Sequence, residues 1–206
     1  MHRQAVERTY DRLSKFYDIV WGKVFHKGRV KAIEYLNVGE GDRILEVGVG
    51  TGLSLSLYPE TCTIHGIDLS SHMLCIANKR IRNGKEGLSK VFLHRMDGSR
   101  LAFKDEQFDG IVAAYVMSAT PDPLGMLREM MRVCKKGGKI VFINHFKSEN
   151  PFIAGIEKAI SPVCTRIGFT TDLRLLPLLQ ESNLEVQRKE GVNIFNSWKV
   201  IKCINP

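Results

Sequence analysis

From Arg43 to the end of the chain, short apolar runs alternate with segments of helical pattern, and this alternation constrains the fold most. We predict strands at 43–47, 62–67, 91–95, 108–116 and 139–144, with helices at 54–58, 70–81 and 123–133. Strands joined through helices pair in parallel. Beyond them we predict a helix at 172–181 and two strands at 184–190 and 195–204. The fold class is therefore α/β, a doubly wound, mostly parallel sheet with an antiparallel C-terminal hairpin.

The first part of the chain has a helical pattern. Apolar residues over 6–24 recur at steps of three and four, and Gly22 and Gly28 are expected to interrupt the helix before a second one at 27–36. We interpret residues 1–38 as an N-terminal amphipathic helical cap on a domain that spans the rest of the chain, 39–206.

Positive charge is concentrated at the start of the chain. The first 31 residues hold eight Lys or Arg against three acids, which gives +5 of the net charge of +8. A second basic group runs from Lys79 to Lys90. Clustered positive charge suits nucleic acid or an acidic membrane surface, and the other interpretation is a solvated basic face.

Cysteine, histidine and hydropathy patterns argue against several classes. The five cysteines form no Cys-x-x-Cys pair and no leader precedes them, so we expect reduced thiols in a cytoplasmic protein. The six histidines are scattered, which argues against a metal site. The apolar stretch at 151–164 is broken by Glu157 and Lys158 and is shorter than the ~20 residues that span a bilayer.

A glycine-rich turn follows the first predicted strand, in the sequence Glu46-Val-Gly48-Val-Gly50-Thr-Gly52. Alternating glycines let the backbone pass flat against a ligand, and this spacing differs from the G-x-G-x-x-G of dinucleotide sites. Asp68 lies 22 residues after Glu46, at the end of the next strand. Its carboxylate can accept both hydroxyls of a ribose, and its alternative role is that of an acid at the start of the following helix.

Three further segments are expected at the same edge of the sheet. Met96-Asp97-Gly98 places a carboxylate and a small residue where an adenine ring could lie, although Asp97 could equally be a turn acid. The strand at 108–116 carries Tyr115 near its tip, opposite the glycine turn. The segment at about 146–170 is interpreted as a lid or substrate loop, with an ordinary crossover as the alternative.

These residues resemble the class I S-adenosylmethionine-dependent methyltransferases over roughly 40–145. The resemblance rests on Glu46–Gly52, Asp68, Met96–Gly98, Phe108-Asp109 and Lys136–Gly138. It implies a seven-stranded sheet with an antiparallel last strand, and S-adenosylmethionine as the cofactor. Glu46 and the glycines would hold its methionine part, Asp68 the ribose, and Asp97 with Gly98 the adenine. The predicted cofactor-binding residues are Tyr17, Glu46, Gly48, Gly50, Thr51, Gly52, Asp68, Leu69, Met73, Asp97, Gly98 and Tyr115.

A narrower resemblance is to the bacterial phosphatidylethanolamine N-methyltransferases of the Rhodobacter type. It rests on segments that begin at Tyr10, Ile143 and Ile167. The chain departs from that family at Phe169, where the family often has Trp, and at Lys199 and Lys202, which interrupt its apolar last strand. The resemblance implies methylation of the amine of phosphatidylethanolamine and of its methylated intermediates, towards phosphatidylcholine.

The expected reaction is an in-line displacement at a sulfonium by a neutral amine. Tyr10, Tyr17 and Tyr115 are candidates for cation–π contact with the amine. We predict catalytic roles for Tyr17 and for His145, which could take the proton, bind the lipid phosphate or simply be a core residue. Membrane-binding residues are predicted at Arg12, Lys15, Lys23 and Lys27, on a cytoplasmic protein peripherally associated with the inner membrane.

Three alternatives remain at this point. The ubiquinone and menaquinone C-methyltransferases share the Tyr-Asp start, so a quinone ring is a second candidate substrate. A nucleic-acid methyltransferase is disfavoured because the segment from Tyr115 to Pro121 lacks the Asn/Asp-Pro-Pro-Tyr sequence of base-amine enzymes. A cofactor-binding protein without turnover is the third alternative.

Overall fold

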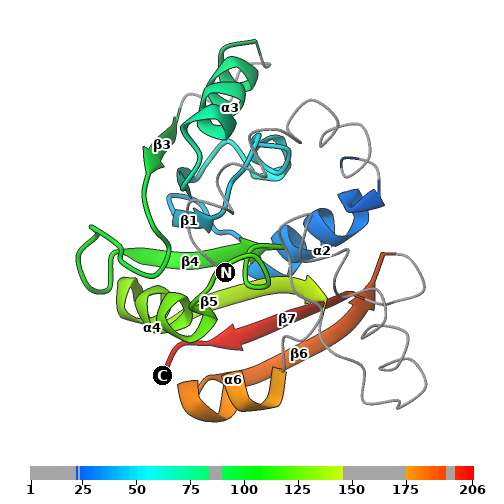
Figure 1. Ribbon diagram of the computed structural model, residues 1–206, viewed down its shortest axis with the longest axis vertical. Coiled ribbons are helices and arrows are strands. Elements are labelled where there is room, and N and C mark those ends of the chain that lie inside the picture. The colour runs from blue at the N-terminus through cyan, green and yellow to red at the C-terminus, as the bar shows by residue number, and fades with distance from the viewer. Residues whose placement is uncertain (1–21, 23, 84–89, 146–174, 194–197) are drawn as a thin grey trace.

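The computed structural model describes residues 22, 24–83, 90–145, 175–193 and 198–206. Over these residues a seven-stranded sheet has the strand order β3-β2-β1-β4-β5-β7-β6 (Figure 1). The strands are β1 (Arg43–Val47), β2 (Thr63–Asp68), β3 (Val91–Arg95), β4 (Phe108–Ala114), β5 (Cys134–His145), β6 (Glu185–Val192) and β7 (Trp198–Ile204). The helices are α2 (His26–Leu36), the 3₁₀ turn η1 (Leu55–Leu57), α3 (Ser71–Asn83), α4 (Pro123–Val133) and α6 (Leu175–Ser182).

The pairing pattern confirms the predicted fold class. β1 pairs in parallel with β2 and β4, and the parallel pairing continues to β3 on one side and β5 on the other. β7 runs antiparallel to both β5 and β6. The pattern is that of a Rossmann-like sheet that ends in an antiparallel hairpin, with α3 near the β3 edge and α6 near the β6 edge (Figure 1).

Three local predictions differ from the structure. β5 begins at Cys134, five residues before the predicted start, because Gly137 N–H donates to Asn205 O and Asn205 N–H donates to Gly138 O, both at 2.9 Å. The link between the last two strands lies later than predicted, since β6 extends to Val192 and β7 begins only at Trp198. Gly28 was expected to interrupt a helix, but it lies inside α2.

Alternate residues of the central strands pack into two cores on opposite faces of the sheet. In β5, Ile140 and Phe142 join the core that includes Met126 and Leu127 of α4, while Val141 and Ile143 join the core that includes α2. This period of two is that of a strand buried on both faces. The strands whose ends carry the site are thereby packed on both faces.

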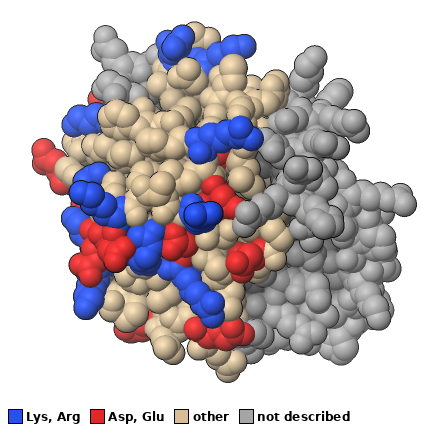
Figure 2. Space-filling view, turned by 60° about the vertical axis from the view of Figure 1, so that its left-hand side comes forward, with Lys and Arg blue, Asp and Glu red and all other residues tan. Residues whose placement is uncertain are grey.

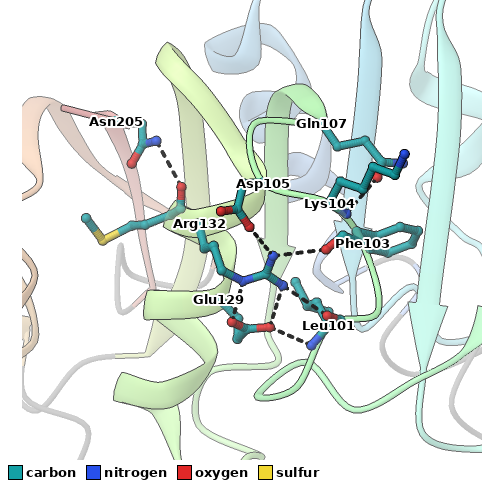
Figure 3. A network of polar contacts seen from close by, with 9 residues as sticks. Leu101, Phe103, Lys104, Asp105, Gln107, Glu129, Arg132 and Asn205 are labelled. Atoms are coloured by element: carbon teal, nitrogen blue, oxygen red, sulfur yellow. Dashed lines mark hydrogen bonds and ion pairs between the residues drawn. The ribbon is translucent and has the colours of Figure 1, made fainter.

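The connection from β3 to β4, residues 96–107, contains no helix and is held by one arginine of α4 (Figure 3). The Arg132 guanidinium donates to Leu101 O at 3.0 Å and to Phe103 O at 2.9 Å. It also pairs with the carboxylates of Asp105 at 2.6 Å and Glu129 at 2.7 Å. Charge-assisted hydrogen bonds to several acceptors order a segment that has few backbone bonds of its own. The anchored residues, Leu101 to Asp105, come shortly after Asp97 and Gly98 in the same connection, so this network supports one side of the candidate site.

Candidate cofactor site

A cavity opens at the carboxyl ends of β1, β2, β3 and β4, where ligands bind in open α/β sheets. Its lining residues are Val47, Gly48, Gly50, Ile67–Ser70, Met73, Met96–Gly98, Ala114–Val116, Ala119–Pro121 and Met126. Eight of the residues predicted from the sequence are among them, namely Gly48, Gly50, Asp68, Leu69, Met73, Asp97, Gly98 and Tyr115. Glu46, Thr51 and Gly52 belong to the same turn but lie outside the lining. Tyr17 lies outside the described residues.

Asp68 connects the glycine turn to the start of α3. Its Oδ2 accepts a hydrogen bond from Gly50 N–H and its Oδ1 accepts one from Ser70 N–H, both at 2.9 Å. Ser70 Oγ in turn accepts from Met73 N–H at 3.1 Å, as expected of an N-cap serine. A carboxylate oxygen can accept more than one hydrogen bond, so both roles considered for Asp68 are compatible in one side chain. It serves the start of the following helix, and it also lines the cavity.

The glycine turn approaches the end of β4 closely. Gly48 has a φ of 74°, and a Cβ at this position would lie 2.6 Å from Val116 Cγ2. The N–H groups of Gly48 and Val49 both donate to Ile67 O at 2.9 Å, which fixes the turn on the end of β2. Only glycine satisfies both the backbone conformation and the available space. The sequence predicted the bare backbone, but not Val116 as the residue that fills the space.

Glu46 is a buried carboxyl beneath this turn. It is 2% exposed, and its Oε1 accepts a hydrogen bond from the Ser54 hydroxyl. Burial raises the pKa of Glu46 to about 7, against the opposing effects of the Ser54 hydrogen bond and the charge of Arg29.

The region expected to receive adenine has a polar turn and a thioether lining. Asp97 Oδ1 accepts from Ser99 N–H at 2.9 Å and from Ser99 Oγ at 2.8 Å, so the turn-acid role of Asp97 is present in the structure. Met73, Met96 and Met126 also line the cavity. Met126 was missed because its position in α4 reads as ordinary helical core. Polarisable thioethers suit a flat aromatic ring.

The other predicted residues lie apart from the cavity lining or outside the described part of the chain. His145 is half-buried at the end of β5, with its ring 5.6 Å from that of Trp198. Lys27 is exposed on α2. Arg12, Lys15, Lys23 and the loop at 146–170 lie outside the described residues. Their predicted roles stay predictions.

The described surface shows mixed charge on one face. In Figure 2, basic side chains lie beside acidic ones over much of the lower half of that face. Within the described residues, no helix is long and apolar enough to cross a membrane.

Sequence comparisons match the chain to enzymes. A family model described as a methyltransferase domain matches residues 45–142. A phosphatidylethanolamine N-methyltransferase of Cereibacter sphaeroides is 39% identical over 187 residues, which are 90% of each chain. A demethylmenaquinone methyltransferase of Bacillus velezensis is 30% identical over 164 residues, which are 76% of this chain and 68% of the relative.

Structure comparisons agree on the fold. The cyclase SpnF superimposes with a TM-score of 0.82 at 19% identity, covering 98% of this chain and 95% of its own. An S-adenosylmethionine-dependent methyltransferase from Aquifex aeolicus gives 0.69 at 19% identity, with 96% and 98% covered. At such identities these structures establish a common architecture, which hosts more than one activity.

Proposed function

Since this chain belongs to the S-adenosylmethionine-dependent methyltransferases, and so is an enzyme with S-adenosylmethionine as methyl donor, we propose that its acceptor is the amine of phosphatidylethanolamine and of its methylated intermediates. The observation that carries the proposal is the 39% identity to a phosphatidylethanolamine N-methyltransferase over 90% of both chains. That similarity spans 187 residues, whereas the methyltransferase domain model matches residues 45–142.

The cavity fits the cofactor in its chemistry. The bare backbone at Gly48 and Gly50 would lie along the methionine part, and Asp68 has acceptor capacity for the two ribose hydroxyls. The thioethers of Met73 and Met126 would face the adenine. When bound, the cofactor supplies a methyl group on a sulfonium, open to in-line displacement. The role of the chain is to align the acceptor with that methyl group and to exclude water.

An amine acceptor must be neutral to react. A lipid amine resembles Lys, whose pKa of about 10 leaves it protonated in water. Burial and the nearby sulfonium both disfavour the charged amine, so a closed cavity lowers its pKa. Tyr17 and His145 are the proposed groups that touch the acceptor or receive its proton. The basic residues Arg12, Lys15, Lys23 and Lys27 are proposed to hold the enzyme on anionic lipid, each contributing about 1 kcal/mol.

The second candidate acceptor is a quinone ring. The observation that favours it is the 30% identity to a demethylmenaquinone methyltransferase. A ring carbon must be activated as an enolate or phenolate, whereas an amine needs only to lose a proton. The two acceptors therefore make different demands on the side of the cavity opposite the glycine turn.

The test uses the purified chain, methyl-labelled S-adenosylmethionine and vesicles of phosphatidylethanolamine with or without phosphatidylglycerol, beside a parallel reaction with demethylmenaquinol. We expect label in mono-, di- and trimethylated head groups, at a rate that falls without the anionic lipid and with added salt. Label in the quinol alone, or in neither acceptor, contradicts the lipid assignment. An equal rate on purely zwitterionic vesicles contradicts the membrane-binding part while leaving the acceptor assignment intact.

A further inference from the structure

We propose that Asn193, at the turn after β6, is a positioning residue that holds Tyr115 against the cofactor cavity. The inference rests on the proposed use of this cavity by S-adenosylmethionine. It adds a residue outside the matched methyltransferase domain to the machinery of the site.

Tyr115 has a backbone conformation that needs support. It directly follows β4, its φ is 63°, and its N–H donates to Ile143 O at 2.7 Å. A left-handed conformation is unfavourable for an aromatic residue and persists only where the surroundings impose it. Because Tyr115 also lines the cavity, whatever imposes this conformation shapes the site.

The side chain of Tyr115 is held by the start of α2 and by Asn193. Its hydroxyl donates to Phe25 O at 3.2 Å and accepts from Asn193 Nδ2 at 2.9 Å. Its ring packs against that of Phe25, with 4.5 Å between centroids. The hydroxyl hydrogen is thus committed to a backbone carbonyl. Tyr115 lines the cavity, and its hydroxyl serves as an anchor.

Asn193 also caps α2 from a distant part of the chain. The residue before α2, Phe25, provides no side-chain cap, and an N–H in the first turn of a helix has no partner within the helix. Asn193 Oδ1 accepts from Gly28 N–H at 3.1 Å, so one amide satisfies the helix and the tyrosine together. Displacement of Asn193 would therefore remove a hydrogen bond from the start of α2 and another from Tyr115. We name Tyr115, Phe25, Gly28 and Asn193 the clasp.

The clasp combines three backbone features, each of which lowers the stability of a folded protein when it occurs alone. Gly28 weakens a helix interior, yet a Cβ there would lie 2.2 Å from Tyr115 Oη and 3.1 Å from the Asn193 amide. Asn193, like Tyr115, has a positive φ, of 62°. Unfavourable backbone conformations of this kind are concentrated at functional sites, where the surrounding structure holds them in place. In the clasp the three unfavourable features lie together around Tyr115, which lines the cavity. Asn183 also has a positive φ, but it lies in the turn between α6 and β6.

The experiment is a double-mutant cycle read as S-adenosylmethionine affinity by calorimetry. Asn193→Gly removes the amide and keeps the backbone conformation, and Tyr115→Phe removes the anchor and keeps the ring. We expect each variant to weaken binding about three- to tenfold, and the double variant to bind no more than about twofold worse than the weaker single variant. Asn183→Gly is the matched control and should leave the affinity unchanged.

Single-variant effects that multiply in the double variant would overturn the proposal. So would an Asn193→Gly protein that is less stable to urea but binds the cofactor as tightly as the wild type, because that is the result of a merely structural role. If Asn193→Gly does not fold, Asn193→Asp replaces it, since it keeps an acceptor for Gly28 N–H and lacks the amide donor. Since the readout is cofactor binding, a failure of the acceptor assignment leaves this test intact.

Discussion

The two walls of the cavity are built from different kinds of contact. The glycine-loop wall, made of Gly48, Gly50, Asp68, Asp97 and Gly98, is held by hydrogen bonds between residues 2 to 28 positions apart. The second wall lies at the end of β4, where Tyr115 lines the cavity. It is held by the clasp, whose hydrogen-bonded partners lie 78 to 165 positions apart in the sequence. Contacts between residues that are close in the sequence can form in any chain with this strand-turn-helix pattern. Contacts between residues far apart in the sequence form only when the complete fold has formed.

This difference separates what is general in the enzyme from what is particular. The cyclase SpnF shares the architecture and not the named reaction, so the sheet does not by itself decide the reaction. The clasp involves α2 and the β6–β7 turn, both outside the matched domain at 45–142. Acceptor specificity is therefore to be sought on the side of the clasp.

The largest expected effect comes from breaking the glycine-loop wall at Asp68. Asp68→Asn removes the charge and turns an amide NH₂ toward one of the two backbone donors, Gly50 N–H or Ser70 N–H. We expect S-adenosylmethionine affinity, measured by calorimetry, to fall about 100-fold, since charge-assisted bonds are lost and donors face each other.

The matched control is Asp42→Asn. Asp42 Oδ2 accepts from Gly39 N–H at 2.7 Å in a turn that is not part of the cavity lining. The affinity of the Asp42→Asn variant for the cofactor should equal that of the wild type. An equal loss of affinity in both variants would mean that general destabilisation, rather than a contact in the cavity, explains the Asp68 result.

A second prediction concerns the point where the two walls touch. Gly48→Ala and Gly137→Ala both place a side chain at a φ near 70°, but a Cβ meets Val116 at 2.6 Å in the first and nothing within 4 Å in the second. We expect the free energy of unfolding in urea to fall by about 1 kcal/mol for Gly137→Ala and by about 3 kcal/mol for Gly48→Ala. Val116→Ala removes Cγ2 but keeps Val116 Cβ, 2.7 Å from the added Cβ, so it should restore only a small part of the difference. Equal losses at the two glycines would contradict the close approach.

The sequence was most informative about the glycine-loop wall. The spacing of Gly48 and Gly50, and the acids at strand ends, predicted positions that line the cavity. They could be predicted because residues that are close in the sequence make the contacts of this wall. The same reasoning misread Gly28 as a helix interruption, since the need for a bare backbone there comes from residues far along the chain, Tyr115 Oη at 2.2 Å from a Cβ and the Asn193 amide at 3.1 Å. Val116 was likewise missed, because nothing near it in the sequence indicates which residue it faces.

The smallest expected effect tests whether the two walls act on one buried group. Glu46 accepts from Ser54 on the glycine-loop side and is influenced by the charge of Arg29 in α2. Its pKa of about 7 in the folded protein exceeds the ordinary value of 4.5, so the folded state holds this proton more tightly than the unfolded state. The stabilisation is complete below pH 4.5 and is lost as the pH rises through 7.

Urea unfolding of the wild type and of Glu46→Gln from about pH 5.5 to 7 measures this effect as a difference. The difference is needed because the pKa of His65, lowered by burial to about 4, acts with the opposite sign. We expect the wild type to lose about 1.5 kcal/mol relative to the variant over that range, and exposed Glu60→Gln to behave as the wild type. Arg29→Gln should raise the pKa of Glu46 further and steepen the loss above pH 7. A slope that Arg29→Gln leaves unchanged would mean that the charge of α2 does not reach the carboxyl, and that the walls are electrostatically independent.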